Sequence, residues 1–412
     1  MENDFMERLS NTMSSFYARF INRRIYKRQS SFELLRLYSS FIICLRHVLF
    51  FTFGGYIHHY DLYFLQSITT ISNNTFISMS AYFLVNSHFK LSRLIPIYIW
   101  TYYYSVGIYL FRVLTDQQTY NYEDFYYYLL PVTHSVYWFI GPFIFSQVLY
   151  SLMAPGFKKT KFMGQILILL FWFVLSCWGT LEHFNSITIW DRGQNFVMFL
   201  FYYTIGNIIK NQNIRLDIKF SLLGFIVTAW LHWKGILHML PMFLEDFPTI
   251  AKLLKSDFMF CPLATLQTVF ILLFTQEIPN VPYLSEIINF LGESAFGIYL
   301  YHCHPLVTRE MGTYDINDNK LKPFWPCLFI TFCIWFRSMV VDILNRLLLN
   351  FCVFNTKWYE YFTNSIDKIF SLDEDRTIAG PNDRSDEYNL LNQNLDVEYA
   401  FKEVKIDIDT LE

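Results

Sequence analysis

The sequence is poor in charged residues. Only 16% of its 412 residues are Asp, Glu, Lys or Arg, whereas an ordinary soluble domain has roughly 25%. Hydrophobic residues make up 53% and aromatic residues 20%. A soluble chain of this length would divide into domains joined by polar linkers, but here apolar segments of about 20 residues follow one another. We therefore expect an all-α, polytopic membrane protein.

Several common motifs are missing from the sequence. It has no Walker A loop, no GxGxxG and no HExxH, so nucleotide hydrolysis and zinc proteolysis have no support, and no nucleic-acid partner is expected. The seven cysteines form no CxxC pair and mostly lie in apolar runs. They indicate neither a disulfide framework nor a zinc site, and we interpret them as small core residues. No apolar core precedes Ser31, so no cleavable signal peptide is predicted.

The apolar runs predict about ten membrane-spanning helices. Lys and Arg gather on alternate connections, with 14 in the N-terminal arm and the second, fourth and sixth connections, against six in the other connections. By the positive-inside rule both termini are predicted to be cytoplasmic. The predicted spans lie near residues 32–53, 66–86, 94–114, 137–155, 163–181, 196–210, 219–237, 257–275, 288–306 and 324–350.

The composition divides the chain into three parts. Residues 1–30 form a basic cytoplasmic arm, residues 31–356 form the membrane domain, and residues 357–412 form an acidic, disordered cytoplasmic tail. Residues 371–412 hold 12 Asp or Glu against four Lys or Arg, which is typical of a solvated segment. The remaining positive charge of the membrane domain suits contact with anionic lipid heads.

The first predicted span carries the strongest set of ionisable residues. An ionisable group inside a span costs several kcal/mol unless it is paired or faces a polar cavity. Arg36 and His47 are eleven residues apart, which places them on one face of a helix, about 16 Å apart along its axis. One face therefore combines a permanent cation at the inner leaflet with a titratable base deep in the membrane.

Two interpretations of this face stay open. A membrane transacylase needs a cation to hold the phosphates of a cytosolic acyl donor, and an imidazole to take the proton from an incoming hydroxyl. Alternatively, Arg36 only reaches the lipid heads and His47 is a hydrogen-bonded helix contact.

The Arg36 and His47 spacing resembles the signature of the acyltransferase 3 family, integral-membrane acyltransferases that O-acylate cell-surface glycans. Later segments agree with this resemblance in their order. Ser80-Ala81 is similar to a Ser-Gly pair of the second span, with Ala in place of the usual Gly. The other similar segments are Arg93 to Trp100 with Pro96, Tyr137-Trp138-Phe139 followed by Pro155, and Leu291 to His302 with Gly292, Ser294, Tyr299 and Leu300.

The resemblance implies a bundle of about ten spans in the cell membrane. It would accept an acyl group, usually acetyl from acetyl-CoA, on the cytoplasmic side and transfer it to a glycan or lipid-linked saccharide. His47 would be the catalytic base, with Arg36 and Arg93 as donor-binding cations. The implied partners also include membrane lipid and other envelope polysaccharide enzymes.

Further candidate residues have weaker support. His302 and His304 flank Cys303, but side chains two apart on a helix do not share a face, so no metal is expected. His134 and the tyrosines near 120–128 would suit sugar recognition, although aromatic residues also gather at membrane interfaces. Asp342 and Arg346 are four residues apart and predict an ion pair within one helix. Ser294, Tyr299, His302 and Trp138 are site candidates through the resemblance.

Two other function classes fit a protein of many spans. A transporter or flippase is permitted by the span number, but no internal repeat and no matched pair of broken spans supports it. A glycan polymerase would explain the aromatic third connection but leaves the basic inner face without a role. Consumption of acetyl-CoA separates an acyltransferase from both alternatives.

Overall fold

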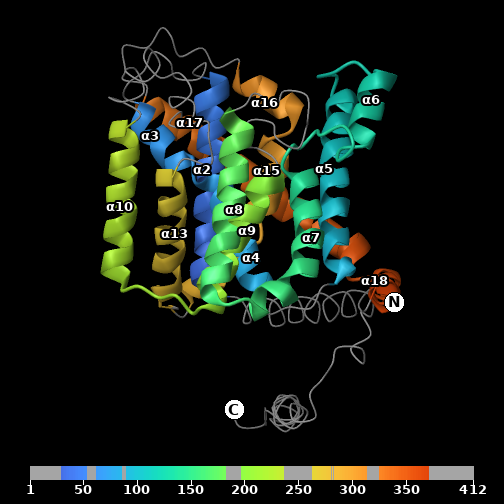
Figure 1. The fold of residues 1–412 in the computed structure, drawn as a ribbon. Helices are drawn as coiled ribbons and strands as arrows, with labels where there is room; N and C mark the ends of the chain where they lie inside the picture. The colour runs from blue at the N-terminus through green and yellow to red at the C-terminus, as the bar shows by residue number, and fades with distance from the viewer. Residues whose placement is uncertain are drawn as a thin grey trace, which may run out of the picture.

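The structure is a computed structural model that describes residues 29–52, 62–85, 90–181, 196–235, 262–279, 281, 283–312 and 324–370. Every regular element within these residues is helical, as the composition predicts. Most of the long helices stand side by side as an upright bundle (Figure 1). The basic arm and residues 371–412 lie outside the described residues, so the predictions for them stay predictions.

Among the described residues, four helices are long and apolar enough to cross a membrane. These findings confirm the prediction of multiple membrane helices, whereas ten spans and two cytoplasmic termini stay predictions. The four segments are α2 (Ser30–Thr52), Leu91–Leu114 with 3-10 helix η2 (Leu91–Arg93) and α5 (Leu94–Leu114), α7 (Ile140–Lys159), and Phe324–Phe354 with α17 (Phe324–Leu349) and π-helical η5 (Asn350–Phe354).

Helix α2 lies at the centre of the bundle. Of its apolar window 56% is buried, against 28% or 33% for the other three candidate spans. It packs on seven other helices, among them α17 and the short helices of the late chain. This central position explains why its apolar residues are spread around the helix and do not form one stripe.

Four more predicted spans coincide with helices. The described bounds agree with the apolar runs to within a few residues, and α7 ends four residues later than predicted. Residues 257–261 of the predicted span 257–275 lie outside the described residues. The helices are α8 (Phe162–Leu181), α9 (Phe196–Asn211), α10 (Ile218–Lys234) and α13 (Pro262–Glu277).

The predicted span 66–86 is not one helix. It is divided into α3 (Tyr63–Thr69) and α4 (Ser72–Leu84). The hydroxyls of Thr69 and Thr70 both donate to the carbonyl oxygen of Gln66, at 3.0 Å each. Such bonds from side chain to backbone compete with the helix ladder and bend it, and the break is tolerated because these residues are buried in protein.

Helix α4 continues into a close crossing with α9. A Cβ added at Gly206 of α9 would overlap the carbonyl oxygen of Ser78 and would lie 3.0 Å from the Cβ of Ala81. A small residue on each helix therefore permits the approach. Ala81, where the resemblance leads one to expect Gly, is still small enough for this crossing.

The predicted span 288–306 is not a single helix either, so this prediction is wrong. It consists of α14 (Leu284–Gly292), α15 (Ala295–His302) and α16 (Pro305–Met311). Pro305 has no backbone N–H and disfavours helical geometry at the residue before it, so His304 is extended with φ −61° and ψ 132°. The apolar pattern continued through both breaks and concealed them.

The predicted tail begins with a helix. Residues 357–370 form α18 (Lys357–Phe370), which corrects the expectation of disorder for this part of the tail. Its residues alternate between apolar and polar with the period of a helix, and a segment of that kind is stable where one face packs or meets lipid. The carboxylate of Asp367 accepts hydrogen bonds from the backbone N–H of Ser92, at 3.0 Å, and from its hydroxyl, at 2.6 Å. This contact fixes α18 at the start of α5.

Candidate active site

The break between α15 and α16 brings a group of imidazole and thiol side chains onto α2. His302 is the last residue of α15, and Cys303 follows it before the chain turns into α16. The Sγ atom of Cys303 lies 3.4 Å from Nδ1 of His47 and 3.4 Å from Nε2 of His302. The two imidazole rings are 5.1 Å apart between centroids. The structure therefore unites two predicted site residues, His47 and His302.

The contacts of this cluster favour one arrangement of its protons. His302 Nδ1 is 2.5 Å from the carbonyl oxygen of Ile298, so it carries the proton and donates, which leaves Nε2 as an acceptor. The Cys303 thiol then donates to His302 Nε2, and its sulfur accepts from Nδ1–H of His47. With both rings neutral, the free lone pair of His47 is on Nε2. The arrangement therefore yields one imidazole nitrogen able to accept a proton.

The same three side chains also offer metal ligands. The ligand atoms of His47, His302 and Cys303 lie within 4.8 Å of one another. Imidazole and thiolate groups both ligate zinc, and two histidines with one thiolate are the donor set of blue-copper sites. A ligating histidine commonly donates its other N–H to a carbonyl, as His302 does. The group does not include His304, and its third member, His47, comes from α2. The expectation of no metal stays a prediction.

The predicted donor-binding cations lie near the opposite end of α2 and at the start of α5. Arg36 donates to Glu33 at 2.7 Å, and 31% of its side chain is exposed. A guanidinium has five N–H donors, so this ion pair leaves capacity for a phosphate. Arg93 is exposed in η2, beside Ser92 and its contact with α18.

Ser294 belongs to a second polar cluster, at the N-terminal end of α15. Arg346 of α17 donates to the hydroxyl of Ser294 at 3.1 Å and to the carboxylate of Glu293 at 2.7 Å. The predicted pair with Asp342 is confirmed at 3.7 Å. Asp342 also accepts from the Tyr104 hydroxyl at 2.9 Å. This cluster is an ion network across α5, α15 and α17, and not a single pair within one helix.

Tyr299 lies close to the histidine cluster, within a group of buried rings. Its ring centroid is 6.3 Å from that of His302 and 6.1 Å from that of Tyr137. The Tyr137 hydroxyl is buried and has no hydrogen-bond partner among the described residues. A buried hydroxyl without a partner costs about 1–3 kcal/mol.

Two predicted site residues, Trp138 and His134, do not contact the histidine cluster. Trp138 is half-buried and packs edge-on against Phe139, so its contacts are those of a core residue. The ring of His134 contacts Tyr126 and Tyr127 of α6 (Tyr122–Leu129). None of the contacts of these two residues within the described chain reaches the cluster around His47.

Sequence reasoning missed Cys303, Glu293 and a third group in which Arg112 and Arg337 pair with Glu310. Cys303 was interpreted as a small core residue, although two flanking histidines were a signal. Arg337 in the middle of an apolar run was another signal, because a charge at that depth needs a partner.

Compared with known protein families, residues 29–341 match the acyltransferase 3 family, described as an acyltransferase domain. No curated protein matches the chain, and no solved structure matches it. The match covers α2, both breaks of the late chain and most of α17, and it therefore includes the His47 cluster. The chain belongs to the acyltransferase 3 family of polytopic membrane proteins, and it is an acyltransferase.

Proposed function

We propose that this protein is a membrane-bound O-acyltransferase that moves acetyl from cytosolic acetyl-CoA to a hydroxyl of a cell-surface or lipid-linked glycan. It would work in the cell membrane, with about ten spans and both termini in the cytoplasm. The observation that carries the proposal is the contact of Cys303 with Nδ1 of His47 and Nε2 of His302, which favours the His47 tautomer with its lone pair on Nε2.

His47 acts as the general base in this proposal. Its Nε2 takes the proton of the acceptor hydroxyl while the hydroxyl oxygen attacks the thioester carbonyl. The carbon–oxygen bond forms, the carbon–sulfur bond breaks, and the proton passes to the departing thiolate of coenzyme A. Cys303 and His302 hold the ring of His47 in the tautomer that this step needs.

Arg36 and Arg93 hold the donor. Both lie toward the predicted cytoplasmic ends of their helices, where the phosphates of coenzyme A would arrive. Arg36 and His47 are about 16 Å apart along α2, a separation that requires an extended donor. Acyl-CoA has this form, because a flexible arm joins its phosphates to the thioester.

The flippase and polymerase alternatives need no acyl donor, and membership of an acyltransferase family favours transfer over both. The proposal is tested in sealed membrane vesicles of known orientation that contain the full chain, supplied with radiolabelled acetyl-CoA. We expect label on saccharide only when the donor meets the cytoplasmic face, and none with His47→Ala. Equal labelling by His47→Ala, at equal protein level, would overturn the proposal.

A further inference from the structure

A cavity of about 470 Å³ lies between α5 and α17, and its lining does not include His47, His302 or Cys303. Its volume is in the range of small-molecule sites. Helix α15 packs on both α5 and α17 and supplies Tyr301 to the cavity, and α16 supplies Val307 and Glu310. The cavity is thus a crevice between two candidate membrane spans, closed toward the bundle interior by α15 and at one end by α16.

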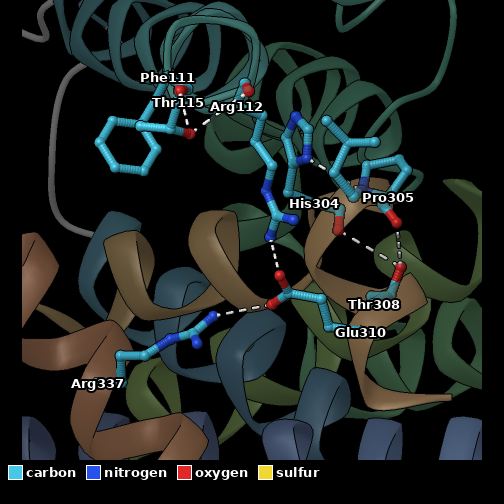
Figure 2. A network of polar contacts seen from close by, with 9 residues as sticks. Phe111, Arg112, Thr115, His304, Pro305, Thr308, Glu310 and Arg337 are labelled. Carbon is cyan, nitrogen blue, oxygen red and sulfur yellow. Dashed lines mark hydrogen bonds and ion pairs between the residues drawn. The ribbon is translucent and has the colours of Figure 1, made fainter. Parts of the chain in front are cut away.

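Three charged side chains meet at the α16 end of this crevice. Arg112 of α5 and Arg337 of α17 both reach the carboxylate of Glu310, each at a different oxygen (Figure 2). The Arg337 contact is 3.3 Å long, and its guanidinium carbon lies 5.3 Å from the centre of the Tyr301 ring. The end of the crevice therefore offers guanidinium donors, a carboxylate acceptor and an aromatic face.

Arg337 is a charged residue within a candidate membrane span, as the fourteenth residue of α17. Its side chain is 48% exposed, and that of Glu310 is 40% exposed. Charges within a span are expensive against lipid and mark substrate paths by default.

The side of the crevice between the two spans is apolar. Phe111 of α5 is 62% exposed, and Gly107, one turn earlier, is exposed too. Val341 of α17 stands across from them in the lining. Helix α5 lies at the edge of the bundle (Figure 1), so this side meets acyl chains when the protein is in a bilayer.

We infer that this crevice binds the acceptor of the proposed reaction, as a lipid-anchored saccharide that enters sideways from the membrane. The hydroxyl-rich head lies among Arg112, Glu310 and Arg337, and the lipid tail lies along Phe111 and Val341. A soluble sugar would make no favourable contact with the apolar side, and a hydrocarbon chain alone would make none with the charged end. The inference rests on the proposed function and specifies its acceptor.

The crevice is well placed for transfer. Tyr301, which forms part of its wall, is followed directly by His302 and Cys303 of the His47 cluster. The C-terminal end of α5 and the start of α17 lie on the predicted outer side, opposite the donor cations. An acceptor head at Tyr301 therefore approaches the cluster from the side that the donor does not occupy.

Gly107 provides a direct test of the crevice. A Cβ added there would meet nothing within 4 Å, so Gly107→Phe fills the entrance without a clash. Gly141 of α7 has equally free surroundings and does not line the crevice, so Gly141→Phe is the matched control. The probe is dodecyl glucoside with a diazirine in its alkyl chain, incorporated into vesicles with the full chain, and the readout is the position of the crosslinks by mass spectrometry.

We expect crosslinks on α5 and α17 in the wild type and in Gly141→Phe, and their loss in Gly107→Phe. Glu310→Gln should weaken competition by unlabelled dodecyl glucoside by about tenfold, because a hydrogen bond to a charged group is lost. Arg309→Gln, at a neighbouring exposed residue, should leave the competition by unlabelled dodecyl glucoside unchanged. Equal competition by phosphatidylcholine would show that the crevice holds bulk lipid. Efficient competition by free glucose would show that the acceptor is a soluble sugar. Either result would overturn the inference.

The same vesicles separate this inference from the proposed function. His47→Ala should keep the crosslinks and lose acetyl transfer. If transfer depends on His47 but the crosslinks are scattered, or Gly107→Phe transfers normally to dodecyl glucoside, the crevice is not the acceptor site. If the crosslinks gather on α5 and α17 but acetyl-CoA is never consumed, the site stands and the proposed function falls.

Discussion

Helix α15 carries a polar cluster at each end, and the two clusters differ in charge. At its N-terminal end, Arg346 is held between the carboxylates of Glu293 and Asp342. At its C-terminal end, His47, Cys303 and His302 form a chain of neutral groups. Buried charges are costly unless they are paired, and in the first cluster every charge has a partner of opposite sign. A chain of neutral groups keeps a lone pair at little cost, so the comparison assigns structure to the first cluster and chemistry to the second.

The largest effect is expected at the neutral cluster. His47→Gln keeps a polar side chain but removes the base, so the rate of acyl transfer should fall by about 10²–10⁴-fold. The measurement is release of free coenzyme A by membranes with equal amounts of protein. Phe50→Leu, on the exposed side of the same helix, is the control and should keep its rate. A His47→Gln protein with the wild-type rate would remove the chemical role from this cluster.

The next effect is on stability, at the charged cluster. Arg346→Met removes the cation that Glu293 and Asp342 share, so the free energy of unfolding should fall by about 3–5 kcal/mol. Thermal unfolding of the purified protein in detergent measures this loss. Adding Glu293→Gln to the same chain should restore part of the stability. A fully stable but inactive Arg346→Met protein would give the charged cluster a chemical role and break the comparison.

A smaller loss of stability is expected from a methyl group beside the charged cluster. A Cβ at Gly297 would overlap the carboxylate of Asp342, so Gly297→Ala should lower the free energy of unfolding by about 1–3 kcal/mol. Gly107→Ala, where a Cβ meets nothing within 4 Å, is the matched control. Equal unfolding temperatures for the two variants would show that Asp342 moves aside freely.

The smallest effect concerns the link between the two histidines. Cys303→Ala removes the group that orients His47, and the loss of one hydrogen bond predicts a rate lower by about three- to tenfold. Cys303→Ser should recover most of the rate, because a hydroxyl also donates and accepts. A stoichiometric metal content in the wild type that both variants lose would show that the three side chains bind a metal instead.

The sequence predicted the overall class of the fold and half of the candidate site. Apolar runs located α2 and α5 closely, because a long helix in lipid must be apolar along its whole length. They did not locate the breaks at Thr70 and Pro305, because backbone buried in protein can break without a change in hydrophobicity. The spacing of Arg36 and His47 placed them on one face of a helix, and both lie on α2.

Contacts between distant segments were beyond the sequence. Nothing in the chain indicates that Cys303 lies against His47, which is 256 residues away, or that Glu310 lies between Arg112 and Arg337. Such contacts depend on how α15 and α16 turn after their breaks. The pair of Asp342 with Arg346 was predicted because it lies within one helix, but its partner Glu293 on another segment was not.

The most direct test of the account is proton NMR of cell-surface glycan for O-acetyl signals. It compares cells that lack the protein with cells that express wild type, His47→Ala or Arg36→Ala at equal levels. The account predicts O-acetyl signals in the wild type, none with His47→Ala, and weak signals with Arg36→Ala, because the donor is held less firmly. The same O-acetyl content in all four, with a change only in the length or export of the glycan, would contradict it.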